Sequence, residues 1–430
     1  MFTSKNVDWF EEIVGKYRLE SYSDLVKPAY GIGSIADIPS LLKRNLGIRP
    51  RREIPDLMRG AVEDVDNMVF FLLDGFGHST VEYALNNFRV PNLRRFLENC
   101  DYTPITSVFP STTSTATVTY QTDLSPAEHG IIGYNAYLSE LGSICNMINL
   151  TPVGRNDYSL LDNGWKVPTI ETNGTIYEEI GRNLIDAFLY LPNAIKGSGM
   201  TRITGRGARV KGYFSVSQLL TTLRRDIEKS VRRSFHFCYI PTVDTLSHKF
   251  GPYTEETAME IDAIFQLINE QLLETLKFDG DVGVAISADH GHTVLSEENV
   301  ADVRDDKFLS AMLRAPVAGD FRAPILRIKH DFLDRATEHL QQFYGSHYLV
   351  KTGTEMLKEE YFGPGKVDPF HADRFGDIAL IPLRDVGLLD SSLGVLDQKL
   401  NKFELIGMHG GLSTEEMIVP LIFKKLRHKK

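Results

Sequence analysis

The chain contains 430 residues, 42% of them hydrophobic and 24% charged, which is the composition of a globular protein long enough to bury a large core. Its formal net charge of −10 at pH 7 argues against a scaffold that wraps nucleic acid, because such binding depends on neutralising phosphates with Lys and Arg. The three cysteines form no CxxC pair and are odd in number, which argues against a disulfide framework or a cysteine zinc site.

The predicted location is the cytoplasm. Cys100, Cys145 and Cys238 are expected to be small core residues in a reducing compartment. The longest clean apolar run near the amino end, residues 68–73, is too short to cross a bilayer, and MFTSKNVDWFEE has acidic residues where a signal peptide needs an apolar stretch. We therefore expect no membrane span, and the sequence leaves the oligomeric state open.

Residues 1–65 are predicted to form a helical lead-in, in which YGIGSIADIPSLLKRNLG gives one amphipathic helix after a glycine-rich turn. A catalytic region over residues 66–430 then begins with the apolar strand NMVFFLL. A helix near PNLRRFLENC, a strand that ends at VFP and a helix that opens at Thr113 follow in alternation. This alternation predicts an α/β fold with a mostly parallel central sheet flanked by helices.

Two segments are predicted to leave this core as inserted cap or loop excursions. Residues 136 to about 215 begin with the hairpin-like AYLSELGSICNMI and continue into a glycine-rich stretch that lacks the order of a P-loop. The core resumes with helices in SVSQLLTTLRRDIEK and EETAMEIDAIFQLINEQLLETLK and with the strands FHFCYI and DVGVAIS. Residues 295 to about 375 form the second excursion, and GDIALIPL and MIVPLIF are predicted as closing strands.

Seven residues in short polar motifs are candidate metal ligands or nucleophiles. They are Asp74 in LLDGFG, Thr113 in FPSTTSTA, Asp244 and His248 in PTVDTLSHKFG, Asp289 and His290 in ISADHGH, and His409 in GMHGG. Most of these motifs follow or interrupt apolar, β-prone runs, so the side chains are expected where strands end and loops begin. Carboxylates together with imidazoles suit divalent ions such as zinc, and two neighbouring ions can hold the attacking and leaving oxygens of a phosphoryl displacement. The set predicts metal-assisted hydrolysis.

Three of these motifs constrain the local geometry. Asp244 and His248 are spaced i, i+4, so a helix after FHFCYI would present both on one face. Asp289 and His290 are adjacent and would point to opposite faces of a strand, so they can share an ion only where the strand ends. A helix that opens at Thr113 would place this hydroxyl where backbone N–H groups and the helix dipole stabilise phosphate charge.

Single motifs also have purely structural interpretations. Asp74 could start a turn, and His409 could be a loop histidine. We interpret His78, His129 and His292, which lie near the motifs, as orienting or packing residues. The seven candidates taken together favour the two-metal interpretation, because the structural one must explain all of them as coincidences.

The order of the motifs, DG, FPxxT, TxLxPxxHGI, DxxxH, ADHG and HGG, resembles the alkaline phosphatase superfamily, and most closely its type I phosphodiesterase/nucleotide pyrophosphatase family. The resemblance implies two divalent ions, most simply zinc, with manganese as the alternative. One ion would be bound by Asp74, Thr113, Asp289 and His290, and the other by Asp244, His248 and His409. Thr113 would be the nucleophile and would form a covalent threonine intermediate that water then releases.

Thr113 is chosen from a threonine-rich run because two counts match the family. It is the fourth residue after Phe109, and it lies nine residues before the threonine of a TG-like dipeptide. Two positions depart from the family. Asp123 stands where that dipeptide usually has Gly. Tyr134 stands where an Asn donates to a phosphate oxygen, with Asn135 beside it, so these two are the candidate substrate-binding residues.

Three functions fit the sequence. The first is hydrolysis of a phosphodiester or nucleotide pyrophosphate bond in a small-molecule substrate. The second is a phosphomonoesterase or phosphonate hydrolase on the same machinery, and the third is a catalytically silent binding module, which would be expected to have lost ligands. The nucleophile motif has no Arg or Lys and uses Thr rather than Ser, which favours diesters, although Arg202 or Arg206 could fold into the pocket.

Overall fold

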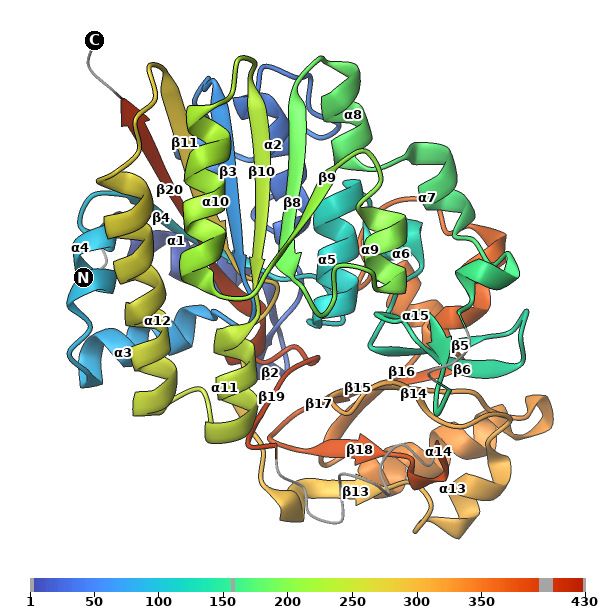
Figure 1. The fold of residues 1–430 in the computed structure, drawn as a ribbon. Helices are drawn as coiled ribbons and strands as arrows, with labels where there is room; N and C mark the ends of the chain where they lie inside the picture. Colours follow the sequence, from blue (N-terminus) through green and yellow to red (C-terminus); the bar gives the residue numbers. More distant parts are fainter. Residues whose placement is uncertain (1–3, 156–158, 394–404, 428–430) are drawn as a thin grey trace.

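A seven-stranded mixed sheet forms the centre of the molecule (Figure 1). The structure is a computed structural model that describes residues 4–155, 159–393 and 405–427. The strand order is β4-β20-β11-β3-β10-β8-β9; β20 is antiparallel to both neighbours, and the other pairs are parallel. The strands are β3 (Asn67–Leu73), β4 (Asp101–Thr106), β8 (Asp186–Pro192), β9 (Arg209–Tyr213), β10 (Ser234–Ile240), β11 (Asp281–Ser287) and β20 (Ile418–Arg427). This confirms the predicted α/β fold.

The register of the three central strands explains why a site can assemble at one edge. β10 pairs with β3 up to the last residues of both strands, Ile240 and Leu73. On the other side of β3, Ser287 at the end of β11 pairs with Leu72. Because these strands are parallel and in register, the residues that follow them meet at the carboxyl edge of the sheet.

Helices cover both faces of this sheet, as Figure 1 shows for α10 and α12 in front of it and α2 behind it. The flanking helices are α2 (Ile38–Asn45), α3 (His78–Asn87), α4 (Pro91–Leu97), α5 (Thr113–Thr122), α8 (Ile176–Arg182), α10 (Val216–Glu228), α11 (Thr242–Phe250) and α12 (Glu255–Leu267). In α10, Ser215 caps the amino end by accepting from the Gln218 amide, and Leu219, Leu223 and Ile227 form one buried stripe. This stripe is what packs the helix on the sheet.

A second, antiparallel sheet, here called the cap sheet, lies beyond the carboxyl ends of the parallel strands (Figure 1). Its order is β16-β17-β15-β14-β5-β6-β7. The strands are β5 (Asn135–Leu138), β6 (Ser143–Asn146), β7 (Thr151–Pro152), β14 (Ala318–Asp320), β15 (Ala323–Leu326), β16 (Tyr348–Thr352) and β17 (Ile378–Pro382). The predicted hairpin at AYLSELGSICNMI is present as β5 and β6. The pairing of β14 with β5 joins the two predicted excursions into one sheet.

The structure differs from the sequence expectation at the borders of these excursions. Residues 176–213 were expected within the first excursion, but they form α8, β8, α9 (Gly199–Thr204) and β9, and both strands belong to the main sheet. GDIALIPL was expected to close the core, but it forms β17 of the cap sheet. β8 and β17 are both apolar strands, and their residues alone do not determine which sheet supplies their hydrogen-bond partners.

The described part of the lead-in, residues 4–65, packs on the same core as the main sheet. The predicted amphipathic helix is present as α2, and Ile38, Leu41 and Leu42 are buried in that core. Lys43 on this helix is also buried, and its ammonium nitrogen lies 2.9 Å from a carboxylate oxygen of Asp123 at the end of α5. The lead-in therefore contacts the helix that begins with Thr113.

The other described helices and strands lie around the two sheets. They are α1 (Ser4–Tyr17), β1 (Arg18–Leu19), β2 (Tyr22–Val26), α6 (Pro126–His129), α7 (Pro168–Asn173), β12 (Thr293–Val294), β13 (Val300–Asp302), α13 (Lys307–Met312), α14 (Leu333–Tyr344), α15 (Gly353–Lys358), β18 (Gly387–Leu389), β19 (Gly407–Met408) and α16 (Thr414–Met417). Within the described ranges, no helix has the length and apolar character needed to span a membrane. Cys100, Cys145 and Cys238 are free thiols; Cys145 and Cys238 are buried core residues, whereas Cys100 is half-buried.

Candidate metal centre

The structure brings all seven candidate ligands together at the carboxyl edge of the main sheet. They come from five places in the chain: Asp74 directly after β3, Thr113 at the start of α5, Asp244 and His248 on α11, Asp289 and His290 after β11, and His409 directly after β19. The predicted helix that carries the i, i+4 pair is present, and β11 ends at Ser287, so the adjacent pair lies beyond the strand. The contacts divide the side chains into two groups.

The first group is built around the imidazole of His290. Its Nε2 atom lies 3.4 Å from Asp74 Oδ1, 3.5 Å from Asp289 Oδ2 and 3.2 Å from Thr113 Oγ1. The other oxygens of both carboxylates are held by hydrogen bonds: the Gly75 amide donates to Asp289 Oδ1 over 3.1 Å, and the Tyr239 hydroxyl donates to Asp74 Oδ2. Sequence reasoning missed Tyr239, because a tyrosine at the end of a buried strand looks like a core residue.

The first group contains two buried carboxylates, those of Asp74 and Asp289, whose negative charge a bound cation would balance. Asp74 Oδ1 and Asp289 Oδ2 are buried, and neither has a hydrogen-bond partner among the described residues. Burial, together with the neighbouring carboxylates of Asp289 and Asp244, raises the pKa of Asp74 well above its usual range. Buried carboxylates that face one another are stable when paired with a cation, so these oxygens fit a divalent ion.

The second group is built around Asp244. Its Oδ1 atom lies 3.2 Å from His248 Nε2 and 3.8 Å from His409 Nε2. His248 Nδ1 lies 2.6 Å from the Gly407 carbonyl oxygen, and His409 Nδ1 lies 3.1 Å from the Ser111 carbonyl oxygen. Carbonyl acceptors fix the proton on Nδ1, which leaves each Nε2 lone pair free to bind a metal ion.

His292 joins the second group, although its sequence position did not mark it as a ligand. Its side chain is fully buried, and its Nε2 atom lies 3.0 Å from Asp244 Oδ1. The ligand atoms of Asp244, His290, His292 and His409 lie close enough together to hold one ion, and so do those of Asp74, Asp289 and His290, so His290 lies between the two groups. Gly75 makes room for this ring, because a Cβ atom there would lie 2.4 Å from His292 Cε1. Gly75 also has a φ of 72°, which favours glycine.

A cavity of about 620 Å³ opens onto both groups and onto Thr113. Tyr134 and Asn135, the candidate substrate-binding residues, line it, and the Asn135 Oδ1 atom is buried without a hydrogen-bond partner among the described residues. Asp320 of β14 also lines it. Its Oδ1 atom accepts from the Tyr134 amide over 3.1 Å and from Thr112 Oγ1 over 3.4 Å. Burial raises the pKa of Asp320 to about 7.

Asp320 was missed because it lies in the second predicted excursion, 186 residues from its hydrogen-bond partner Tyr134. Two other residues were considered and lie elsewhere. Arg202 pairs with Asp162, and Arg206 pairs with Glu171 and Glu178, and neither arginine lines the cavity. The sequence suggestion that one of them enters the pocket is not met in the structure.

Of the two other histidines near the motifs, His129 has a clear structural role. The Ile131 amide donates to His129 Nδ1 over 3.0 Å, so the ring proton is on Nε2, which lies 3.0 Å from Thr119 Oγ1 in α5. His78 lies beside Tyr102, with 2.7 Å between its Nδ1 atom and the tyrosine hydroxyl. Both fit the expected orienting or packing role.

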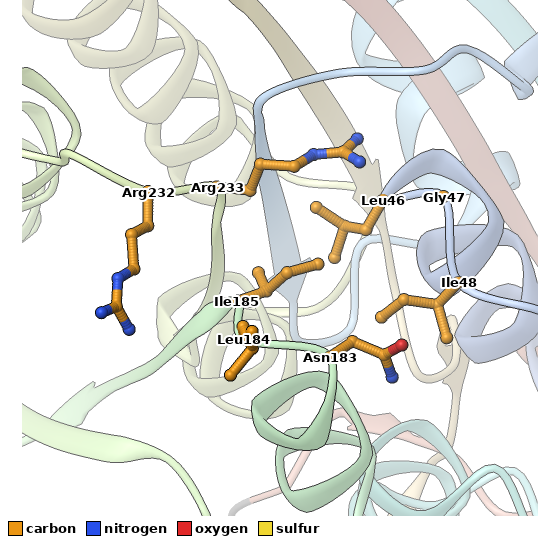
Figure 2. A pocket seen from close by; sticks show the side chains of 8 residues that line it. All are labelled: Leu46, Gly47, Ile48, Asn183, Leu184, Ile185, Arg232 and Arg233. Atoms are coloured by element: carbon orange, nitrogen blue, oxygen red, sulfur yellow. The ribbon is translucent and has the colours of Figure 1, made fainter.

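A second cavity lies at the opposite, amino edge of the sheet (Figure 2). It has a volume of about 540 Å³ and is lined by residues that precede β8 and β10, including Arg233. The Arg233 guanidinium is bonded to Asp64 and to the Val65 carbonyl. The described residues that line this second cavity include no carboxylate, imidazole, hydroxyl or thiol side chain. The side chains suited to catalysis therefore line the first cavity, at the carboxyl edge of the sheet.

Comparison with known proteins decides the family. A model of the type I phosphodiesterase / nucleotide pyrophosphatase family matches residues 68–412. The chain belongs to this family. The chain is also 25% identical to an uncharacterized pyrophosphatase/phosphodiesterase of Schizosaccharomyces pombe, over 354 residues that make up 80% of this chain and 67% of that relative.

Solved structures share the fold of this family member. Murine ectonucleotide pyrophosphatase / phosphodiesterase 5 has a TM-score of 0.60 at 17% identity, over 83% of this chain and 87% of that chain. Phosphonoacetate hydrolase from Sinorhizobium meliloti, in complex with phosphonoacetate, has a TM-score of 0.60 at 16% identity, over 83% of this chain and 89% of that chain. These likenesses show a shared fold, which agrees with the family match to a phosphodiesterase/pyrophosphatase family of the alkaline phosphatase superfamily.

Proposed function

We propose that this protein is a two-metal hydrolase that cleaves phosphodiester or nucleotide pyrophosphate bonds with Thr113 as its nucleophile. The observation that carries the proposal is the position of Thr113. Its hydroxyl lies at the amino end of α5, 3.2 Å from His290 Nε2, and faces the cavity that both ligand groups share. A helix amino end favours the negative charge of an attacked phosphate.

Zinc is the proposed metal, with manganese as the alternative. The first ion would be held by Asp74, Thr113, Asp289 and His290, whose unpaired carboxylate oxygens support the assignment. The second would be held by Asp244, His248 and His409. When bound, two divalent ions neutralise phosphoryl oxygens and make a hydroxyl or water easier to deprotonate.

The chain's own residues would act in two steps. In the first, Thr113 Oγ1 forms a bond to phosphorus, the bond to the leaving oxygen breaks, and the hydroxyl proton is passed on to the leaving group, which departs as an alcohol from a diester or as a phosphate from a pyrophosphate. Tyr134 and Asn135 would donate to a phosphoryl oxygen during this step. In the second step water attacks phosphorus, the bond to Thr113 breaks, and the threonine recovers its proton.

Relatives of similar fold support a nucleotide-like substrate and an essential threonine. A variant of murine ectonucleotide pyrophosphatase / phosphodiesterase 5 with a threonine replaced by alanine is described as inactive and was solved in complex with AMP, with a TM-score of 0.58 and 15% identity to this chain. Because a phosphonoacetate hydrolase has a similar fold, phosphonate hydrolysis is the second candidate function.

The metal content and the nucleophile are tested together. Protein loaded with zinc or manganese is expected to contain about two ions per chain, as in other two-metal hydrolases, and His409→Ala is expected to lose one of them. Thr113→Ala should lose nearly all turnover while it keeps its fold and most of its metal, because it removes the covalent step. Thr112→Ala is the matched control. A full metal complement in His409→Ala, or loss of turnover in Thr112→Ala with a healthy Thr113→Ala, would contradict the assignment.

The two candidate substrate contacts need a separate measurement. If Tyr134 or Asn135 donates to the phosphate in the transition state, Tyr134→Phe or Asn135→Ala should lower kcat more than it raises KM. Bis(p-nitrophenyl) phosphate is the diester probe and p-nitrophenyl phosphate the monoester probe. Unchanged kinetics in both variants would assign the contact to another residue, and a wild-type preference for the monoester would favour the phosphatase alternative.

A further inference from the structure

Two chemically different sets of side chains line the cavity in front of Thr113. One set is the candidate metal ligands. The other set, here called the apolar wall, comes from the cap sheet and its connections, from β18 and its neighbours, and from the segment before His409. The apolar wall consists of Ile148, Val153, Val317, Phe321, Leu388, Leu389, Leu393, Leu405 and Met408. A group attached to the phosphate would contact this wall when the phosphate is at Thr113.

Among the described residues that line this cavity, none is Lys or Arg. The nearby guanidinium groups already have carboxylate partners. Arg304 is bonded to Asp390 through two contacts of 2.6 and 2.8 Å, and Arg322 is bonded to Glu416. Apart from the candidate ligands, Asp320 is the carboxylate that faces the cavity without a cationic partner among the described residues.

These features have opposite effects on charged and uncharged substrate groups. Each further phosphate or carboxylate would lose hydration in the cavity, and sites that accept such anions normally supply Arg or Lys to replace it. An uncharged apolar group instead gains about 25 cal/mol for each Å² that it buries against the wall. The cavity therefore suits one negative charge at phosphorus and an apolar neighbour.

We propose that the enzyme selects phosphodiesters whose flanking group is uncharged and largely apolar, over nucleoside polyphosphates and over phosphonates that carry a carboxylate. This inference rests on the proposed function and narrows it. Asp320, which accepts a hydrogen bond from Thr112 next to the nucleophile, adds to the selection when it is ionised, because its charge then opposes the second negative charge of a monoester.

The test compares substrates that differ in charge. p-Nitrophenyl phenyl phosphate carries one negative charge and an apolar flank, whereas p-nitrophenyl phosphate, ATP and phosphonoacetate carry more charge. The metal-loaded protein is expected to hydrolyse the first with a kcat/KM at least about ten-fold above the others. Hydrolysis of ATP or phosphonoacetate at an equal or higher kcat/KM would overturn the inference while leaving the hydrolase function in place.

Two variants change the charge inside the cavity, one by adding a Lys and the other by removing a carboxylate. Leu389 is half-buried in the apolar wall, so Leu389→Lys should lower kcat/KM for the apolar diester and raise it for ATP. Leu184→Lys, at the cavity on the opposite edge of the sheet, is the matched control and should change neither. Asp320→Asn should raise the monoester-to-diester ratio of kcat/KM roughly ten-fold. Unchanged ratios in both cavity variants would contradict the inference.

A binding measurement separates this inference from the proposed chemistry. Thr113→Ala protein loaded with zinc should bind diphenyl phosphate more tightly than ATP in titration calorimetry, whether or not the wild-type enzyme hydrolyses either. Tighter binding of ATP would overturn the inference. Hydrolysis of no phosphodiester by the metal-loaded wild type, with diphenyl phosphate still preferred in binding, would overturn the proposed reaction and keep the substrate selection.

Discussion

Arg322 and Glu416 form a doubly bonded ion pair in which both side chains are fully buried. The Arg322 Nε and Nη2 atoms donate to the two carboxylate oxygens of Glu416 over 2.6 and 2.8 Å. Arg322 lies between β14 and β15 of the cap sheet. Glu416 lies in α16 and also accepts from the amide of Gly411, two residues after His409. The pair therefore connects the cap sheet to the loop that carries a candidate metal ligand.

Glu416→Ala is expected to lower the free energy of unfolding by about 3–5 kcal/mol, because it leaves a buried guanidinium without its counter-charge. Urea denaturation measures the loss. Asp56→Ala removes the partner of Arg59 in an exposed pair, with 80% and 72% of the side chains accessible, and should change stability by less than about 0.5 kcal/mol. A loss below about 1 kcal/mol in Glu416→Ala would show that the pair does not hold the two parts together.

His292→Ala is expected to weaken metal binding at the Asp244 group about 10- to 100-fold, because the ring contacts Asp244 Oδ1 and keeps that carboxylate in place. Competition with a chromogenic chelator gives the dissociation constants. His339→Ala is the control, since His339 is bonded to Asp306 and lines no part of the cavity. Equal metal affinity in His292→Ala and wild type would mean that the ring only fills space.

Lys43→Met is expected to cost about 3 kcal/mol of stability, because Asp123 would remain buried without its closest cation. Asp123 has a φ of 57° at the end of α5, a conformation that glycine adopts without strain. In an Asp123→Gly background the same Lys43→Met change should therefore cost much less, since the half-exposed Glu179 is the remaining partner. Equal losses in both backgrounds, measured by urea denaturation, would exclude coupling between the two residues.

Asp320→Asn is expected to change how stability depends on pH in the metal-free protein. Burial raises the pKa of Asp320 from 3.8 to about 7, so its ionisation costs stability increasingly as pH rises from about 4 to about 7. The asparagine cannot ionise, so the variant should match wild type near pH 4 and exceed it above pH 7, by of the order of 4 kcal/mol at most. A constant difference between the two proteins across this range would contradict the raised pKa.

The sequence determined which residues could form the metal groups, because apolar strands place polar residues at their ends. Asp74 directly follows one predicted strand and Asp289 lies two residues after the end of another, and parallel register then brings them together. The structure of the helix end also explains why Asp123 can stand where the family usually has Gly. The position requires a φ near 57°, which Asp tolerates and which its pairing with Lys43 supports.

The tertiary structure decided the features that depend on partners far away in the chain. The cap sheet joins β5 with β14 across some 180 residues, and no local pattern specifies such a pairing. For the same reason Tyr239 and Asp320 were not identified as site residues, and His292 was expected only as an orienting or packing residue near the motifs, without its partner Asp244. Each is recognised by the atom it contacts, Asp74 Oδ2 for Tyr239, Asp244 Oδ1 for His292 and the Tyr134 amide for Asp320. A one-dimensional pattern records residue type and spacing along the chain, whereas these contacts exist only after distant strands have paired.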